Sequence, residues 1–318
     1  MGLADLYLTR GSMVFGGVEA KPEDSIALIV GIPYDATSSF RPGSRFAPQA
    51  IRNAATNIEF YSLRAMIDVD DYRIGDLGDI YLPLNPRDAL RRIEDVAYEL
   101  AEQYSGDKLL VFLGGEHTIT IATFGAIKRK YSDTCFLVFD AHFDLRNQYM
   151  EDPFSHACVL RRIVEKYGSD KVFVVGVRAF TREEIEYANS AGIRYLTSHS
   201  IRLLGLREAI DRIKRWLRTA ECSTVYVSID MDVFDPAYAP GVGNPEPEGL
   251  EPWQVFDILF KSIKESNAKI IAADIVEVSP PHDCSGITSI LAARTAVELI
   301  ALHISSKHVG GDKPRRDI

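Results

Sequence analysis

Short apolar runs alternate with amphipathic segments along most of the chain. Runs typical of buried strands, rich in β-branched and aromatic residues, recur at 26–31, 109–113, 135–139, 172–177, 224–229 and 269–275. Apolar residues at helical spacing predict helices near 85–103, 118–130, 156–166, 181–190, 205–219, 251–266 and 286–303. Because strands and helices alternate regularly, the pattern favours an α/β fold in which helices cover both faces of a parallel sheet.

Acidic and histidine residues follow four of these runs, at the point where each predicted strand ends. In chain order they are His117, then Asp140, His142 and Asp144, then Asp230 and Asp232, and finally Glu277. The members of the second group are two positions apart, so they would converge if the strand geometry continued past residue 139. Sites in open parallel sheets gather outside the carboxyl ends of the strands. The sequence therefore predicts one site assembled from four distant segments.

The residue types in this group indicate a metal centre. Buried charges must be paired or must coordinate a metal. Carboxylate-rich sets suit manganese or magnesium, and added imidazole favours transition metals, whereas structural zinc sites favour cysteine and histidine. The four aspartates of the group balance the charge of two divalent ions. We therefore predict two metals that share carboxylate ligands.

Five motifs follow one another along the chain: GGEH at 114–117, DAHFD at 140–144, SHAC at 155–158, SIDMDVFDPAYAPG at 228–241 and DIVEVSPPHD at 274–283. Together with the stretches 31–52 and 76–79, they resemble the signature segments of the ureohydrolases, the arginase and agmatinase family of binuclear manganese enzymes. The FGG at 15–17, the RPGSR loop and the GVGNPEPEGL segment are more similar to agmatinases than to arginases.

The resemblance implies a three-layer α-β-α sandwich around a mostly parallel, eight-stranded sheet. It also implies two Mn²⁺ ions per subunit, of which Asp140 and Asp230 would bridge both. His117 and Asp144 would complete the ligands of the first ion, and His142 and Asp232 those of the second.

The resemblance further assigns three catalytic residues and a reaction. Glu277 would pair with the planar guanidinium group of the substrate. Asp144 would carry a proton to the departing amine, and His156 would hydrogen-bond that amine or relay protons. The expected reaction is hydrolysis of agmatine to putrescine and urea. The expected partners are a small cationic guanidino substrate and further copies of the chain, in a trimer or hexamer.

The resemblance implies that the loop 145–158 recognises the tail of the substrate. Glu151 and Asp152 lie there beside one strong cation, Arg146. They predict an acidic rim that attracts the terminal ammonium of agmatine and repels the carboxylate of arginine. Arg146, Asn147 and Gln148 are donors that could serve a carboxylate instead if they face inward. The proline-rich segment 236–252 is expected to form a rigid wall of the site.

Other functions remain open at this point. Arginase, guanidinobutyrase and formiminoglutamase activities share the metal motifs, and Glu248 and His282 depart from the expected pattern near the substrate mouth. A non-catalytic relative would usually lack a ligand, whereas all six ligand positions are filled. A metal-dependent deacetylase of similar architecture would not need the Glu277 segment. A nucleophilic site at His282 and Cys284 would leave six metal-type ligands unexplained.

Length, composition and charge limit the remaining possibilities. The 318 residues contain no linker, repeat or low-complexity run, which predicts one domain spanning 1–318. The net charge of −9 disfavours nucleic acid as a partner and mildly favours cationic ligands. No stretch is expected to be long and apolar enough to span a membrane, and the N-terminus lacks the features of a signal peptide. Four cysteines without a CxxC pair suit a reducing cytoplasm, the expected location.

Overall fold

One nine-stranded sheet runs through the computed structural model, which describes residues 2–11, 13–104, 106–266 and 268–307. Residues 1, 12, 105, 267 and 308–318 of the single expected domain lie outside the described residues. In spatial order the strands are β1 (Leu8–Thr9), β5 (Ile74–Ile80), β2 (Ala27–Gly31), β6 (Leu109–Leu113), β11 (Lys269–Val276), β10 (Thr224–Asp230), β7 (Cys135–Phe139), β8 (Val172–Val177) and β9 (Arg194–Thr197). A separate hairpin pairs β3 (Tyr61–Ser62) with β4 (Ile67–Asp68).

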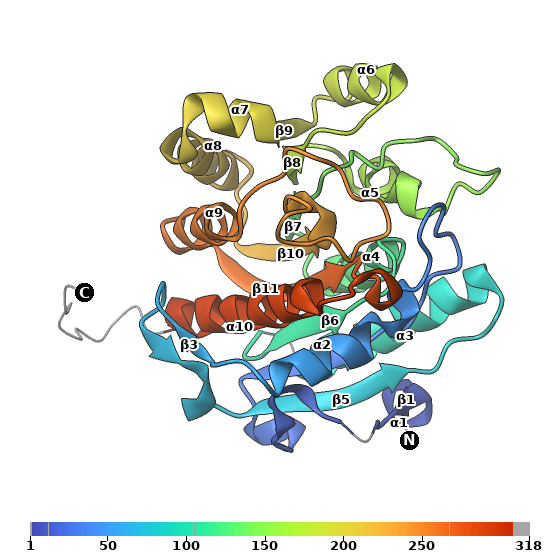
Figure 1. Cartoon of the computed structure of the whole chain (residues 1–318), viewed down its shortest axis with the longest axis vertical. Helices are drawn as coiled ribbons and strands as arrows, with labels where there is room; N and C mark the ends of the chain where they lie inside the picture. Colours follow the sequence, from blue (N-terminus) through green and yellow to red (C-terminus); the bar gives the residue numbers. More distant parts are fainter. Residues whose placement is uncertain (1, 12, 105, 267, 308–318) are drawn as a thin grey trace.

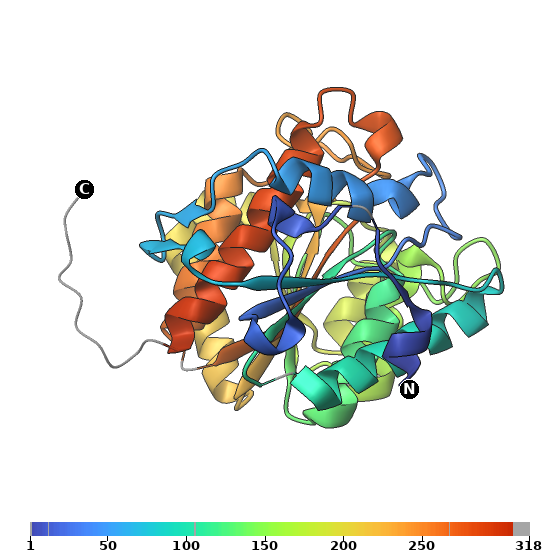
Figure 2. The same cartoon turned by 90° about the horizontal axis from the view of Figure 1, so that it is seen from below.

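Helices cover both faces of the sheet, so the fold has the three layers that the sequence predicted (Figures 1 and 2). One apolar core contains residues from the sheet and from α2 (Ala47–Ala55), α7 (Ser198–Leu204), α8 (Leu206–Thr219), α9 (Pro252–Lys264) and α10 (Ile287–Lys307). The core on the opposite face contains residues from α1 (Leu3–Tyr7), α3 (Pro86–Tyr104), α4 (Ile119–Lys130), α5 (Val159–Tyr167) and α6 (Arg182–Ser190).

Of the nine strands described in the large sheet, eight are parallel, as expected, and the ninth is an addition. The two-residue β1 pairs antiparallel with β5 at the edge of the sheet. β5 was not predicted from the sequence, because glycines and acids interrupt its apolar pattern. Its Asp76 and Asp79 are paired with the buried Arg52 of α2, at 2.7 and 2.6 Å. The ion pairs compensate for placing these acids in the sheet.

The strand order explains why one site can form from distant segments. β6, β11, β10 and β7 are neighbours at the centre of the sheet, and their mutual pairing is parallel. Their carboxyl ends therefore lie at one edge, and the segments that follow them meet there. These are the four segments in which the sequence placed its candidate ligands.

The helix α10 corrects one expectation from the sequence. By length and hydropathy it could cross a membrane, although no such stretch was expected. In the structure, 78% of its most apolar window is buried. The helix packs against α2, α9 and β11, so its apolar character fills the core between neighbouring elements rather than facing lipid.

A disulfide joins Cys135 to Cys222, with 5.6 Å between the Cα atoms. The disulfide was not predicted from the sequence, in which the four cysteines form no CxxC pair and 87 residues separate these two. Cys135 begins β7 and Cys222 precedes β10, and these strands pair so that Cys135 lies opposite Val225. The parallel pairing therefore brings the two sulfurs together. Cys158 and Cys284 are free.

Reduction of this disulfide is expected to lower the melting temperature. A disulfide that closes a loop of this length lowers the conformational entropy of the unfolded chain. On the chain-entropy relation, this stabilises the folded protein by at most about 4 to 5 kcal/mol. Thermal scans of the wild-type protein with and without reductant measure the effect, and Cys284→Ala provides a control because Cys284 is exposed and free. Equal melting temperatures in both conditions would contradict the prediction.

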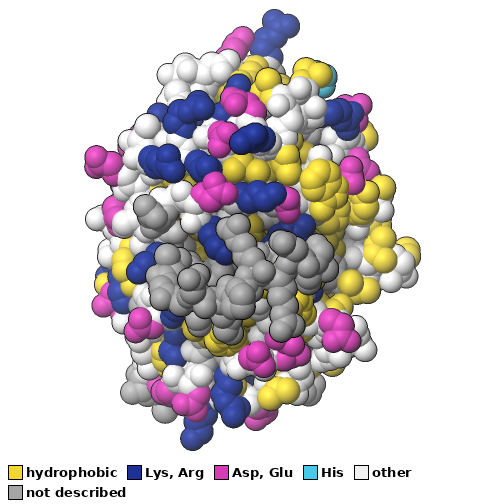
Figure 3. Space-filling view, turned by 90° about the vertical axis from the view of Figure 1, so that its left-hand side faces the viewer, with side chains coloured by type: hydrophobic (Ala, Val, Ile, Leu, Met, Phe, Trp, Pro, Cys, Tyr) yellow, Lys and Arg dark blue, Asp and Glu magenta, His cyan; other side chains and the backbone are white. Residues whose placement is uncertain are grey.

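On the face shown in Figure 3, basic and acidic side chains are mixed rather than separated into patches of one sign. Apolar side chains gather along one edge of this view. The net charge of the sequence predicts that nucleic acid is not a partner. That expectation, like the trimer or hexamer, stays a prediction.

Candidate metal centre and active site

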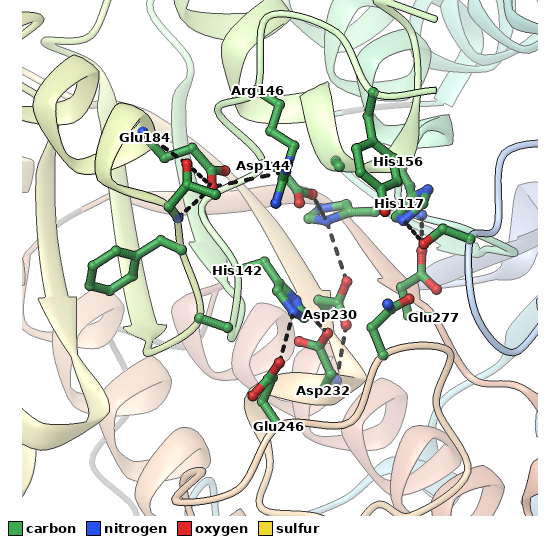
Figure 4. Close-up of a pocket in the computed structure, with 17 residues that line it drawn as sticks. His117, His142, Asp144, Arg146, His156, Glu184, Asp230, Asp232, Glu246 and Glu277 are labelled. Carbon is green, nitrogen blue, oxygen red and sulfur yellow. Dashed lines mark hydrogen bonds and ion pairs between the residues drawn. The ribbon is translucent and has the colours of Figure 1, made fainter. Parts of the chain in front are cut away.

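A pocket of about 300 Å³ opens at the carboxyl ends of the central strands (Figure 4). Of the eight predicted site residues, seven line it: His117, His142, Asp144, His156, Asp230, Asp232 and Glu277. The eighth, Asp140, is 2% exposed and contacts both His117 and His142. The structure therefore brings all eight residues together.

The first cluster of candidate ligands surrounds His117, which follows β6. Its Nδ1 atom lies 3.1 Å from Asp140 Oδ2, 3.1 Å from Asp144 Oδ2 and 3.4 Å from Asp230 Oδ2. All four side chains are buried, yet Nδ1 makes no aligned hydrogen bond. A buried ring nitrogen surrounded by three carboxylate oxygens fits a divalent cation with nitrogen and oxygen ligands.

The second cluster surrounds His142. Its Nδ1 atom lies 2.9 Å from Asp232 Oδ2 and 3.7 Å from Asp140 Oδ1. The other oxygen of Asp232 accepts a hydrogen bond from the backbone N–H of Ala141 at 3.0 Å. This bond orients Oδ2 toward the imidazole, so the second cluster can also hold a cation.

Asp140 belongs to both clusters, because Oδ2 faces His117 and Oδ1 faces His142. This is the arrangement required of a carboxylate that bridges two metals. Asp230 has a different environment: Oδ2 faces His117, while Oδ1 accepts the backbone N–H of Asp232 at 2.9 Å. The geometry therefore supports bridging more directly for Asp140 than for Asp230.

The convergence of Asp140, His142 and Asp144 does not come from a continued strand, as the sequence analysis supposed. β7 ends at Phe139, and Asp144 has a left-handed backbone conformation with φ 52°. Such conformations are costly for residues other than glycine and cluster at functional sites. The turn at Asp144, rather than strand alternation, directs its carboxylate toward His117.

Asp274 and Ser228 support the first cluster, a role that the sequence analysis did not assign. Asp274 lies on β11 and accepts hydrogen bonds from the hydroxyls of Thr120, Tyr226 and Ser228. Ser228 Oγ in turn contacts His117 Nε2 at 3.1 Å. A partner on one ring nitrogen fixes the imidazole and leaves Nδ1 available to a metal. The signal in the sequence was a single acid inside an apolar strand.

Glu277 follows β11 and also has a left-handed backbone conformation, with φ 67°. Its Oε1 accepts a hydrogen bond from the backbone N–H of His117 at 2.7 Å. A Cβ atom at residue 243 would lie 3.1 Å from Oε2, so Gly243 allows the loop to approach this carboxylate closely. Burial, together with the charge of Glu116, raises the pKa of Glu277 to about 8. A cation beside it would favour the ionised form.

The acidic rim predicted from Glu151 and Asp152 is wrong, since neither residue lines the pocket. Residues 149 and 152 pair with each other, and Met150 and Glu151 adopt left-handed conformations in a tight turn. The turn leaves Glu151 exposed. Asp152 Oδ1 accepts the backbone N–H of Phe154.

Other residues form the outer part of the pocket, where a substrate tail would lie. They are Arg146, Tyr149, Phe180, Thr181, Glu184, Asn244 and Glu246. The Nε atom of Arg146 lies 4.0 Å from Glu184, whose carboxylate also accepts hydrogen bonds from Thr181. The 179–184 segment was not predicted from the sequence, because the pairing of β8 with β7 and the bridge between Ala179 and His142 bring it to the site.

The proline-rich segment forms a wall of the pocket, as predicted, through Asn244 and Glu246. Arg178, which follows β8, holds this wall in place. Its guanidinium donates to the carbonyls of Glu246 and Pro247 and also to that of Asp232. The Arg178 side chain thereby fixes the wall relative to the second cluster.

Binding of divalent metal is expected to release protons from the candidate ligands. In the protein without metal, burial lowers the pKa of His142, but the charge and hydrogen bond of Asp232 outweigh burial and raise it to about 10. Burial also opposes protonation of His117, yet Asp140 and Asp144 raise its pKa well above the usual range. The imidazole of His142 is therefore protonated at neutral pH and must lose its proton to coordinate a metal, and the raised pKa of His117 acts in the same direction.

Calorimetric titration with Mn²⁺ in buffers of different ionisation enthalpy measures this release. Because the pKa of His142 is raised to about 10, protons compete with the metal throughout the neutral range. The apparent affinity should therefore rise with pH up to that value. The same titration gives the number of ions bound per chain. Binding heats that do not depend on the buffer would contradict the prediction.

Comparison with known proteins agrees with this geometry. The Arginase family matches residues 25–301. An agmatinase from Pyrococcus horikoshii is 37% identical over 298 residues, covering 93% of this chain and 98% of the relative. An N(1)-aminopropylagmatine ureohydrolase from Thermococcus kodakarensis is 33% identical over 260 residues, covering 81% and 84%. The crystal structure of the agmatine ureohydrolase of Thermoplasma volcanium superposes with a TM-score of 0.82 at 33% identity, covering 95% of this chain and 98% of that one. This chain therefore belongs to the arginase family and is a ureohydrolase-type enzyme.

Proposed function

We propose that this enzyme is a binuclear manganese hydrolase that cleaves the guanidinium group of agmatine to putrescine and urea. The observation that best supports two ions is Asp140, whose two oxygens face two different histidines in one pocket. His117, Asp140, Asp144 and Asp230 would hold one ion, and His142, Asp140, Asp230 and Asp232 the other. The bound ions would supply Lewis-acid activation of water at neutral pH.

The protein's own residues would bind the substrate and move its protons. Glu277 is buried in the pocket and offers a carboxylate to a guanidinium cation. Water contributes oxygen to the guanidinium carbon, the bond from that carbon to the amine nitrogen breaks, and the amine leaves with an added proton. Asp144 and His156 both line the pocket and would deliver that proton.

The charge of the outer pocket supports a dicationic substrate. The outer pocket is lined by two acids, Glu184 and Glu246, against one strong cation, Arg146. Arg146 is already engaged by Glu184 and by the face of the Tyr149 ring. The excess negative charge attracts a distal ammonium group and disfavours a carboxylate.

Urea-release assays over agmatine, arginine and 4-guanidinobutyrate, with and without added Mn²⁺, test this proposal. N(1)-aminopropylagmatine belongs in the same series, since the relative from Thermococcus kodakarensis is named for it. Activity should require the metal, and fully active protein should contain about two ions per chain, as the charge balance of four carboxylates demands. Full activity with one ion per chain would rule out the binuclear site.

Agmatine should be preferred over arginine by at least about 100-fold in kcat/KM, the size of an uncompensated polar contact. Glu246→Gln should reduce this preference, because Glu246 lines the outer pocket and its side chain is 41% exposed there. Glu248→Gln is the matched control, since Glu248 is exposed two residues away and does not line the pocket. Comparable turnover of arginine would reject agmatine as the substrate and leave the family assignment intact.

A further inference from the structure

Glu116 and Thr37 lie behind His156, outside the set of residues assigned to the reaction. Glu116 is fully buried and precedes His117. Its Oε2 accepts the backbone N–H of Thr37 at 2.7 Å, and its Oε1 accepts the Thr37 hydroxyl at 2.6 Å. A hydroxyl has one proton. Because Thr37 Oγ1 donates to Glu116 Oε1, this proton is committed to the carboxyl group of Glu116.

Thr37 also contacts His156, at two atoms. The backbone N–H of His156 donates to Thr37 Oγ1 at 2.9 Å, and the ring atom Nδ1 lies 3.2 Å from the same oxygen. Because the hydroxyl proton of Thr37 points to Glu116, its oxygen can only accept from Nδ1. The hydroxyls of Thr118 and Ser155 are farther away, at 3.4 Å from Thr37 Oγ1 and from Nδ1 respectively.

A proton on Nδ1 determines the state of the other ring nitrogen. In a neutral imidazole with Nδ1 protonated, Nε2 is the acceptor. Nε2 lies 3.2 Å from the hydroxyl of Ser39, which lines the pocket together with His156. The nitrogen that can take up and return a proton is therefore the one on the Ser39 side of the ring.

We propose that Glu116 and Thr37 are positioning residues that hold His156 in the Nδ1–H tautomer, with Nε2 beside Ser39 and available for proton transfer. The proposal rests on the proton-transfer role given to His156 in the proposed function. Neither Thr37 nor Glu116 lines the pocket, so both would act through His156. Thr37 and Glu116 lie in the segments 31–45 and 114–117. Along the chain, α4 and β7 separate the second of these segments from the His156 loop.

Kinetics of Thr37 variants test whether this residue acts through His156. Thr37→Val removes the hydroxyl at nearly constant volume and should lower kcat for agmatine roughly 10-fold, the lower part of the range for impaired acid–base catalysis. KM and metal content should stay unchanged, and Thr37→Ser should restore kcat. Thr295→Val is the matched control, since the Thr295 hydroxyl is bonded within α10 to Leu291.

The double variant Thr37→Val with His156→Ala separates this role from a structural one. If Thr37 acts through His156, the double variant should be no slower than His156→Ala alone. A further 10-fold loss in the double variant would overturn the proposal, as would a Thr37→Val enzyme with wild-type kcat.

Nitrogen-15 NMR gives a readout that does not depend on activity. The full-length protein is loaded with diamagnetic Zn²⁺, and the ring signals of His156 are assigned by their loss in His156→Ala. The wild type should show the Nδ1–H tautomer. In Glu116→Gln the side-chain amide can donate to Thr37 Oγ1, which frees the hydroxyl proton for Nδ1, so the Nε2–H form should increase.

The outcomes distinguish this proposal from the proposed function. A wild-type spectrum of the Nε2–H tautomer, or a Glu116→Gln spectrum identical to wild type, would overturn the positioning role. If instead His156→Ala retains at least half of the wild-type kcat while the spectra behave as expected, the positioning role stands. In that case the proton-transfer role of His156 fails.

Discussion

Asp230→Asn is expected to lower kcat by about 1000-fold or more. Asp230 Oδ2 faces His117, and Oδ1 holds the backbone N–H of Asp232. An asparagine has one acceptor oxygen, so it cannot serve both partners, and it also removes one of the four negative charges that balance two divalent ions. If the transition state loses several kcal/mol of metal-dependent stabilisation, kcat falls by about this factor. Each factor of ten in rate corresponds to about 1.4 kcal/mol of activation free energy.

Metal analysis and steady-state kinetics on the same preparation measure this effect. The variant should contain fewer than two ions per chain after dialysis against limiting Mn²⁺. Asp257→Asn is the control, since Asp257 lies on α9 and pairs with Arg64 and Lys261 outside the pocket. Full metal content with more than a tenth of the wild-type kcat would show that Asp230 does not hold the ions.

His156→Ala is expected to lower kcat by roughly 100-fold, which is typical for the loss of a proton-transfer group. His156 lines the pocket, and both ring nitrogens contact hydroxyl groups, those of Thr37 and Ser39. The ion pairs that the two clusters make with aspartates come from His117 and His142. The variant should therefore keep its metal content and show a KM close to that of the wild type.

Saturation kinetics with agmatine at excess Mn²⁺ test this expectation. His199→Ala is the matched control, because His199 lies exposed on α7 and should tolerate the change within about twofold. A change below twofold in His156→Ala as well would make His156 an ordinary loop histidine. In that case Asp144 would be the remaining candidate for proton delivery.

The parallel sheet could be predicted from the sequence because its central strands are buried on both faces. Such strands appear as continuous apolar runs, and the predicted bounds of 109–113, 135–139 and 172–177 coincide with β6, β7 and β8. β5 could not be found in this way. Its Asp76 and Asp79 are stable there only because Arg52 pairs with them. That contact joins two elements whose proximity is a property of the fold.

The sequence by itself determined which side chains could bind metal and where along the chain they occur. Residue type and the position after a strand end are local properties, so His117, Asp140 and Asp232 could be identified without coordinates. The resemblance to ureohydrolases added His156 and Glu277, which spacing alone would not have distinguished from ordinary loop residues.

Only the tertiary structure decided how these side chains are oriented and supported. Left-handed conformations at Asp144 and Glu277 direct two carboxylates into the pocket. The strand order places Asp274 and Ser228 behind His117 and brings Cys135 to Cys222. A tight turn removes Glu151 from the pocket that Glu246 lines instead. Each of these features depends on backbone angles or on contacts between residues distant in sequence. A local pattern of residue types encodes neither the angles nor the contacts.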